Sequence, residues 1–174
     1  EDLAVGDRVE TGERSRAAIL LADETQVKLN SLSNLTITAI GGAASGVLPA
    51  SAGAAGEGSV LSLGQGEAWI RRKSPGGFEM RTPTASAAIR GTEFDVTQAG
   101  AGETRVAVLD GLVSLRNDVG DVSLAAGALG TARPGQVPTR TVLVEPENAV
   151  QWTLYYPTRL ASAAVQGRAL HLGR

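Results

Sequence analysis

A recurring pattern of short runs, in which aliphatic and polar residues alternate, constrains the fold more than any other feature of this sequence. The runs arrive about every nine residues, at 26–29, 60–63, 78–81, 93–96, 106–109, 112–115 and 122–125. Alternation of this kind places one side of a strand in a core and the other in solvent. No sustained helical period precedes residue 150. We therefore predict an all-β fold, either a twisted antiparallel sandwich or a short solenoid-like stack of hairpins.

Turn-forming residues between the runs predict where strands reverse. Asp110-Gly111 is the strongest signal, because the type I′ turn of a two-residue hairpin needs positive φ at both positions and these residues tolerate it. Asp23-Glu24 predicts another hairpin, although glutamate resists positive φ more than glycine does. Residues 74–77, which read SPGG, predict a third turn.

Composition narrows the class of protein. The 174 residues include 22 glycines and only 3% aromatic residues, so the core must consist mainly of Val, Leu, Ile and Ala. Cysteine is absent, which excludes disulfides and thiolate metal sites. The net charge of −2 gives no reason to expect binding to nucleic acid or anionic lipid. We predict that the chain holds no cofactor and no metal ion.

We expect one β domain over residues 1–146, followed by a short non-β tail over residues 147–174. Within the domain, residues 41–58 are nearly all Gly, Ala and Ser, and such small side chains bury too little area to offset the entropy of ordering. This stretch is predicted to be a flexible insertion, with a functional loop or a cleavage site as the alternative. The Ala-rich stretch after Thr158 predicts one short helix. No apolar run approaches the roughly 18 residues of a membrane span, and we expect a soluble piece of a larger protein.

One segment carries a more specific signal. Residues 82–94 read TPTASAAIRGTEF, and residues 104–115 read TRVAVLDGLVSL. Together with the opening hairpin at 11–37, these segments resemble the FecR domain of bacterial envelope proteins, with Met80 where that family usually has Val. The central block is the specific part of the resemblance, whereas the flanking hairpins alone would be weak evidence.

The resemblance implies an exported all-β module, located in the periplasm or at the cell surface of a bacterium. In the transmembrane regulators of this family, such domains relay a signal from a TonB-dependent receptor to a cytoplasmic anti-sigma region. The tail of this chain is more similar to the junction found in larger exported members that carry tetratricopeptide repeats. The implied function is a non-catalytic protein-interaction scaffold or signal-relay domain. Its partner would be another envelope protein or a neighbouring domain of the same precursor.

Five residues are candidates for an interaction site. Arg90 and Glu93 flank a Gly-Thr pair, so they either stabilise a turn, by satisfying buried backbone groups or each other, or recognise an anionic ligand or a partner strand. Trp152, Tyr155 and Tyr156 form the most aromatic stretch of the chain. We expect these three to plug one end of the β core, with docking to a following domain as the alternative.

A glycan-binding function is the main alternative. The basic triplet at 71–73 lies beside Trp69 and is expected to be a solvated hairpin tip. With Trp69 or the tail aromatics, Arg71 and Arg72 would instead contact peptidoglycan or another cell-surface glycan.

A hydrolytic function is the second alternative. Glu93 and Asp95 share one face of a predicted strand, and paired carboxylates can hydrolyse glycosidic bonds. Solvated charges on a strand face are the commoner reason for such a pair. His171 is the single histidine and lies in the tail, which argues against a nucleophile–histidine–carboxylate triad. We therefore predict no catalytic residues.

Overall fold

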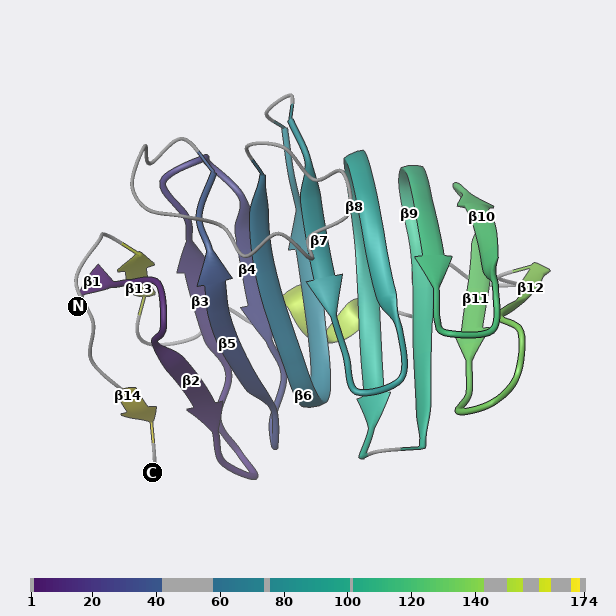
Figure 1. Cartoon of the computed structure of the whole chain (residues 1–174). Coiled ribbons are helices and arrows are strands. Elements are labelled where there is room, and N and C mark those ends of the chain that lie inside the picture. Colours follow the sequence, from purple (N-terminus) through teal and green to yellow (C-terminus); the bar gives the residue numbers. More distant parts are fainter. Residues whose placement is uncertain are drawn as a thin grey trace.

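A computed structural model describes residues 2–41, 58–73, 76–100, 102–142, 150–154, 160–163 and 170–172. Most of these residues lie in strands, which form two packed layers (Figure 1). The prediction of an all-β fold is confirmed. The elements are β1 (Asp2–Leu3), β2 (Arg8–Thr11), β3 (Ala17–Leu20), β4 (Gln26–Leu29), β5 (Asn34–Ala39), β6 (Ser59–Arg71), β7 (Phe78–Arg81), β8 (Ser86–Ala99), β9 (Glu103–Arg116), β10 (Asp121–Ala125), β11 (Ala128–Ala132), β12 (Thr139–Val142), the 3-10 turn η1 (Gln151–Leu154), β13 (Leu160–Ala163) and β14 (Leu170–Leu172).

Three long strands, β6, β8 and β9, are shared by the two layers. The first half of β6 pairs with β5 and β7, and its second half pairs with β4 and β8. One half of β8 pairs with β7, and its other half pairs with β6. One half of β9 pairs with β10, and its other half pairs with β11. The front layer therefore contains β2, β5, β7 and β10, and the back layer contains β3, β4, β11 and β12 (Figure 1). Most pairings are antiparallel, whereas β6 and β7 run parallel.

Each long strand bends at a glycine with a left-handed backbone. The φ angles are 100° at Gly66 in β6, 52° at Gly91 in β8 and 83° at Gly111 in β9. Opposite each other, Gly91 and Gly111 lie where the pairing of β8 with β9 shifts register, between Arg90 and Glu93. A bulge at such a residue turns the strand and increases its twist. These bends allow one strand to serve both layers.

The hairpin predicted at Asp110-Gly111 is wrong. Strand β9 continues through this pair to Arg116. The type I′ hairpin turn that Asp-Gly favours needs positive φ at both central residues, and here only Gly111 has it. The glycine supplies the backbone freedom that the sequence indicated, but it is used for a bulge inside a strand.

The hairpin predicted around Asp23-Glu24 is confirmed, because β3 and β4 pair antiparallel with Leu20 opposite Gln26. Its connection is longer than two residues, and Leu21 N donates to Thr25 O at 2.9 Å. Glu24 adopts a φ of 63° despite its side chain. Asp23 supports the turn by accepting a hydrogen bond from Thr25 N at 3.1 Å.

The core lies between the two layers and is built from the aliphatic residues of the alternating runs. Burial of this apolar area, at about 25 cal/mol per Å², is the main source of stability. The rings of Phe78 and Phe94 meet edge to face with their centroids 6.2 Å apart. The largest fully buried side chains are Leu3, Leu29, Leu35, Ile37, Leu61, Leu63, Ile70, Met80, Ile89, Phe94, Leu115 and Leu124.

The tail differs from the non-β segment that was expected. Besides η1 it contributes two short strands, of which β13 lies between β1 and β3, and β14 runs parallel to β2. The stretch after Thr158 forms β13 where a short helix was predicted. The physical reason is that the edge of β3 offers unpaired backbone groups, which a short extended segment satisfies. Within the described ranges, no helix is long and apolar enough to cross a membrane.

The insertion predicted at 41–58 lies, apart from its two end residues, outside the described residues. At its near end, Gly41 N donates to Ser59 Oγ at 2.8 Å.

Candidate functional site

The outward side of the back layer carries a row of unusual residues for a strand surface. Lys28 of β4 lies opposite Trp69 of β6, and Trp69 lies opposite Asp95 of β8. Ala68 and Ile70, the neighbours of Trp69 in sequence, belong to the core, so Trp69 lies on the other side of the sheet. We call Lys28, Glu67, Trp69, Glu93 and Asp95 the covered strip.

The segment η1 covers this strip from outside. In Figure 1 it lies behind the centre of the back layer, beside β6 and β8. Lys28 Nζ donates to Thr153 O at 2.6 Å and lies 5.2 Å from the centroid of the Trp69 ring. Only 5% of Trp69 and 4% of Asp95 remain exposed. The chain's own η1 segment thus covers the centre of this outer sheet face, where Trp69 and Asp95 lie.

Glu93 is held by two neighbours from β6. Its Oε1 accepts a hydrogen bond from Trp69 Nε1 at 3.1 Å, and its Oε2 lies 3.8 Å from Arg71 Nε. Arg90 lies before the Gly91 bend, where β8 pairs with the front-layer half of β9, and its side chain is exposed. The bend therefore places Arg90 and Glu93 in halves of β8 that belong to different layers.

Asp95 is a buried carboxyl group in an unfavourable setting. Burial raises its pKa well above the usual value, and the negative charge of Glu67 raises it further. Hydrogen bonding by Trp152 and Thr97 lowers the pKa by a smaller amount. Glu67 in turn accepts a hydrogen bond from Asn30 Nδ2 at 2.6 Å. The strip thus places two carboxyl groups close together under η1.

The geometry gives little support to either alternative function, hydrolysis or glycan binding. Glu93 is occupied by an indole and a guanidinium group, and Asp95 is covered, so the two carboxyl groups do not face a substrate together. Trp69 has almost no exposed ring surface on which a sugar could stack. In the described part of the chain, no group of three or more metal-ligating side chains comes together.

Arg72 was expected at a solvated hairpin tip, and this is wrong. Its Nη1 lies 3.0 Å from Asp23 Oδ2, with only 3% of its side chain exposed. The guanidinium carbon also lies 5.9 Å from the centroid of the Phe78 ring. Continuing the alternation of Ala68 and Ile70 by two residues would have placed Arg72 on the core side. Arg71, by contrast, has 49% of its side chain exposed, as predicted.

Trp152 lies over the covered strip, beside Asp95, and not at an end of the β core. Tyr155 and Tyr156 lie outside the described residues. The side chain of His171 is likewise not described, although its backbone belongs to β14.

Comparison with known families gives a clear result. The sequence matches the FecR protein family over residues 7–114, which is more than half of the chain. The chain belongs to the FecR family. Among curated individual proteins, none matches it.

Two crystal structures share the fold of this FecR domain. Both are of a protein from Parabacteroides distasonis ATCC 8503 that is provisionally named an anti-sigma factor. The TM-scores are 0.64 and 0.65, each at 15% sequence identity and covering 84% of this chain. The similarity spans 64% and 63% of those longer chains, so this chain corresponds to less than two thirds of their length.

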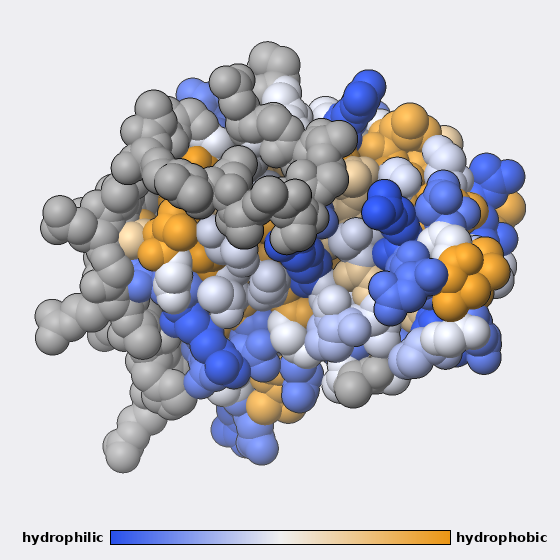
Figure 2. Space-filling view, viewed as in Figure 1, coloured by the Kyte–Doolittle hydropathy of each residue, from blue (hydrophilic) through white to orange (hydrophobic). Residues whose placement is uncertain are grey.

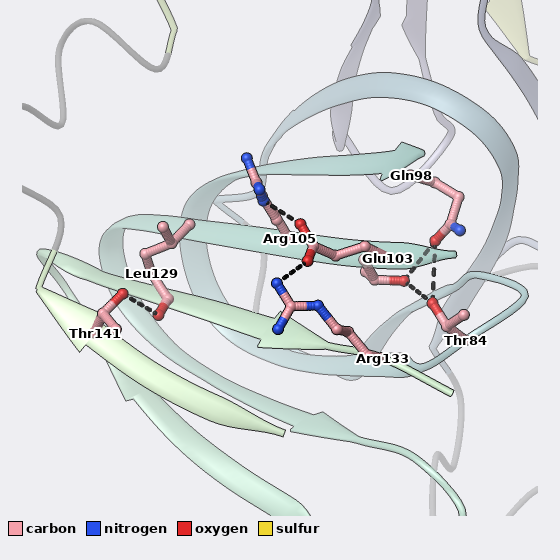
Figure 3. A network of polar contacts seen from close by, with 8 residues as sticks. Thr84, Gln98, Glu103, Arg105, Leu129, Arg133 and Thr141 are labelled. Atoms are coloured by element: carbon pink, nitrogen blue, oxygen red, sulfur yellow. Dashed lines mark hydrogen bonds and ion pairs between the residues drawn. The ribbon is translucent and has the colours of Figure 1, made fainter. Parts of the chain in front are cut away.

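The FecR signature residues have structural roles that the fold explains. Thr82 Oγ1 accepts a hydrogen bond from Ala85 N at 3.0 Å and closes the turn after β7. Thr84 and Thr104 hydroxyls meet each other and the side-chain amide oxygen of Gln98 (Figure 3). This buried network ties the turn after β7 to the turn between β8 and β9. The signature therefore encodes the closure of one end of the sandwich.

A second, more exposed cluster lies next to this network. Glu103 pairs with Arg105 of its own strand and with Arg133 just after β11 (Figure 3). Desolvation opposes ionisation of Glu103, but the two arginines outweigh it and lower the pKa of this carboxyl. Both arginines are largely exposed, so such pairs contribute little to stability.

Among the described residues, the outer face of the front layer offers no comparable candidate. Over β8 to β12, Figure 2 shows charged side chains interspersed with separate apolar ones. Leu112 and Val119 are about half exposed there. Scattered apolar residues of this kind are normal on a protein surface.

Removing the Glu93 carboxylate tests whether the covered strip is a packed part of the fold. Glu93→Ala leaves Trp69 Nε1 without its acceptor, and we expect a loss of about 1–2 kcal/mol in the free energy of unfolding. Glu93→Gln keeps an acceptor oxygen and should lose less than half as much. Urea denaturation followed by far-UV circular dichroism measures both. Equal losses would show that the hydrogen bond to Trp69 is not what matters.

Proposed function

We propose that this FecR domain is a non-catalytic signal-relay or scaffold module of the bacterial envelope, exported to the periplasm or the cell surface, which binds another protein. The match of residues 7–114 to the FecR family carries the proposal. Family membership and the fold shared with a provisionally named anti-sigma factor point to a regulatory role without catalysis. The contacts of Glu93 with Trp69 and Arg71, and the burial of Asp95, are consistent with a role without catalysis.

An exposed strand edge is the best candidate for the partner contact. Among the described strands, β12 ends the back layer and pairs only with β11, while β10 pairs only with β9. All four residues of β12 are exposed, and Val142 is 80% exposed. Edge strands present unpaired backbone groups to which an extended segment of another protein can add. The partner would be an envelope protein or a neighbouring domain of the same precursor.

Site-specific photo-crosslinking in the full-length precursor tests this proposal. A photoreactive amino acid at Arg140 in β12 should give a discrete crosslinked product in the periplasmic or surface fraction. The same amino acid at Arg14, an exposed turn residue away from that edge, serves as the matched control. Failure to crosslink from β12, or retention of the protein in the cytoplasmic fraction, would overturn the proposal.

A titration separates this function from glycan binding. Trp69 and Trp152 are the two tryptophans of the chain and both belong to the same region, so intrinsic fluorescence reports on that region alone. Because Trp69 and Arg72 are buried, we expect no saturable change in fluorescence when soluble peptidoglycan fragments are added. A saturable change would favour the glycan-binding alternative.

A further inference from the structure

We propose that residues 150–154 form a proton-controlled latch, which closes over the covered strip while Asp95 holds a proton and opens when that proton is lost. This inference concerns how the chain covers its own sheet face. It does not depend on the proposed function.

Two contacts with the sheet carry this inference. The hydrogen bond from Lys28 Nζ to Thr153 O joins it to β4, and Trp152 packs beside Asp95 of β8. Within the latch, Thr153 N and Oγ1 both donate to Val150 O, at 2.9 Å and 2.8 Å, so the turn satisfies part of its own backbone. Away from the sheet, a single turn of this kind is not stable in water, so opening of the latch exposes its amide groups to solvent.

The hydrogen-bonding groups of Trp152 and Asp95 are poorly satisfied where these two side chains meet. Trp152 Nε1 and Asp95 Oδ2 are both buried, and neither makes a hydrogen bond of ordinary geometry. Buried polar atoms without well-formed hydrogen bonds destabilise the arrangement that buries them. The closed latch is therefore only weakly preferred, so that a small change in charge can shift the balance between closed and open states.

The protonation state of Asp95 determines the net charge of the site beneath η1. Glu67 on β6 is the negative neighbour, and Glu93 is the next outward-facing residue on Asp95's own strand. Lys28 on β4 lies on the far side of Trp69. On β9, Ala107 lies opposite Asp95, and the next outward-facing residue, Arg105, is paired with Glu103. The latch residues Gln151–Leu154 carry no charge. Loss of the proton therefore places a second negative charge beside Glu67, in a site that η1 shields from water.

The direction of the pH effect follows from these surroundings. When the latch is open, Asp95 is hydrated and has an ordinary pKa, whereas closure raises that pKa, first by burial and then by Glu67. The closed state thus binds a proton that the open state has already released. Closure is fully favoured below the open-state pKa, and this advantage is lost as the pH rises through the closed-state pKa.

Acrylamide quenching of Trp152 tests the latch directly. Trp69→Phe leaves Trp152 as the single tryptophan. Between pH 4 and pH 9 we expect the quenching constant of this variant to rise at least twofold, while far-UV circular dichroism stays constant. Adding Asp95→Asn, which is neutral at every pH, should hold quenching at the low-pH value. Adding Glu93→Gln is the matched control on the same strand and should leave the pH dependence in place.

Hydrogen exchange can be measured on the unmodified chain, so this second test does not depend on whether a variant folds. The Thr153 amide, bonded to Val150 O, should lose protection as the pH rises, after correction for intrinsic exchange. Quenching and protection that do not change with pH would overturn the proposal. So would an Asp95→Asn variant whose pH dependence equals that of its parent.

Discussion

Replacing Arg72 with alanine is expected to lower the free energy of unfolding by about 3–5 kcal/mol, because it leaves one half of a buried ion pair without its partner. The Arg72 guanidinium lies 3.0 Å from Asp23, and only 3% and 8% of these two side chains are exposed. Asp23 also accepts hydrogen bonds from Ser59 Oγ at 2.6 Å and from Thr25 N. The pair therefore anchors the β3–β4 turn to the residue that follows the end of β6, and the hydrogen bond from Ser59 anchors the same turn to the start of β6. Without Arg72, a carboxylate would remain in this dry region.

Urea denaturation monitored by circular dichroism measures this effect. Arg71→Ala is the matched control, because this neighbouring arginine is half exposed and lies 3.8 Å from Glu93, so its loss should cost less than about 1 kcal/mol. The double variant Asp23→Asn with Arg72→Met removes both charges and should recover much of the lost stability. Similar losses from Arg71→Ala and Arg72→Ala would contradict the account of Arg72 as a buried partner.

Strand alternation explains how much of the fold could be predicted. It correctly placed Phe78, Met80 and Val106 in the core, since a period of two fixes which side of a strand is buried. It did not show that β6, β8 and β9 each serve both layers, because the pattern continues unchanged through a bend. Gly111 illustrates the difficulty. A single left-handed glycine is compatible with a hairpin or a bulge, and only the partner strand decides which one forms.

The candidate site was less predictable than the fold. The FecR resemblance drew attention to Glu93, and its position on the same strand face as Asp95 was read correctly. Neither signal indicated that Asp95 would be buried on the outside of the sheet and Glu93 partly buried beside it, because the cover comes from Trp152, far along the chain. A short uncharged turn has no sequence pattern that specifies where it docks. Tyr155 and Tyr156 remain predictions for interaction residues.

Gly66→Ala is expected to be as damaging as the loss of Arg72, with a decrease of about 4 kcal/mol in the free energy of unfolding. Gly66 has a φ of 100°, which residues with a side chain rarely adopt. A Cβ atom there would lie 2.5 Å from Ser33 Cα and 2.1 Å from Ser33 Oγ, so backbone would have to move. Ser33 Oγ accepts the hydrogen bond of Glu67 N at 3.0 Å. The substitution therefore disturbs the place where β6 passes between the layers.

Gly6→Ala separates backbone strain from this close approach. Gly6 has a φ of 95°, close to that of Gly66, and a Cβ atom there would meet nothing within 4 Å, so we expect a loss of only about 1–2 kcal/mol. Chemical denaturation of both variants gives the comparison. If the two losses are equal, the approach of Ser33 adds nothing and left-handed φ alone accounts for Gly66. A much larger loss at Gly66 means that contact between the loop before β5 and β6 fixes the bend. Since Glu67 follows this bend immediately, the same contact would then also set the position of the covered strip.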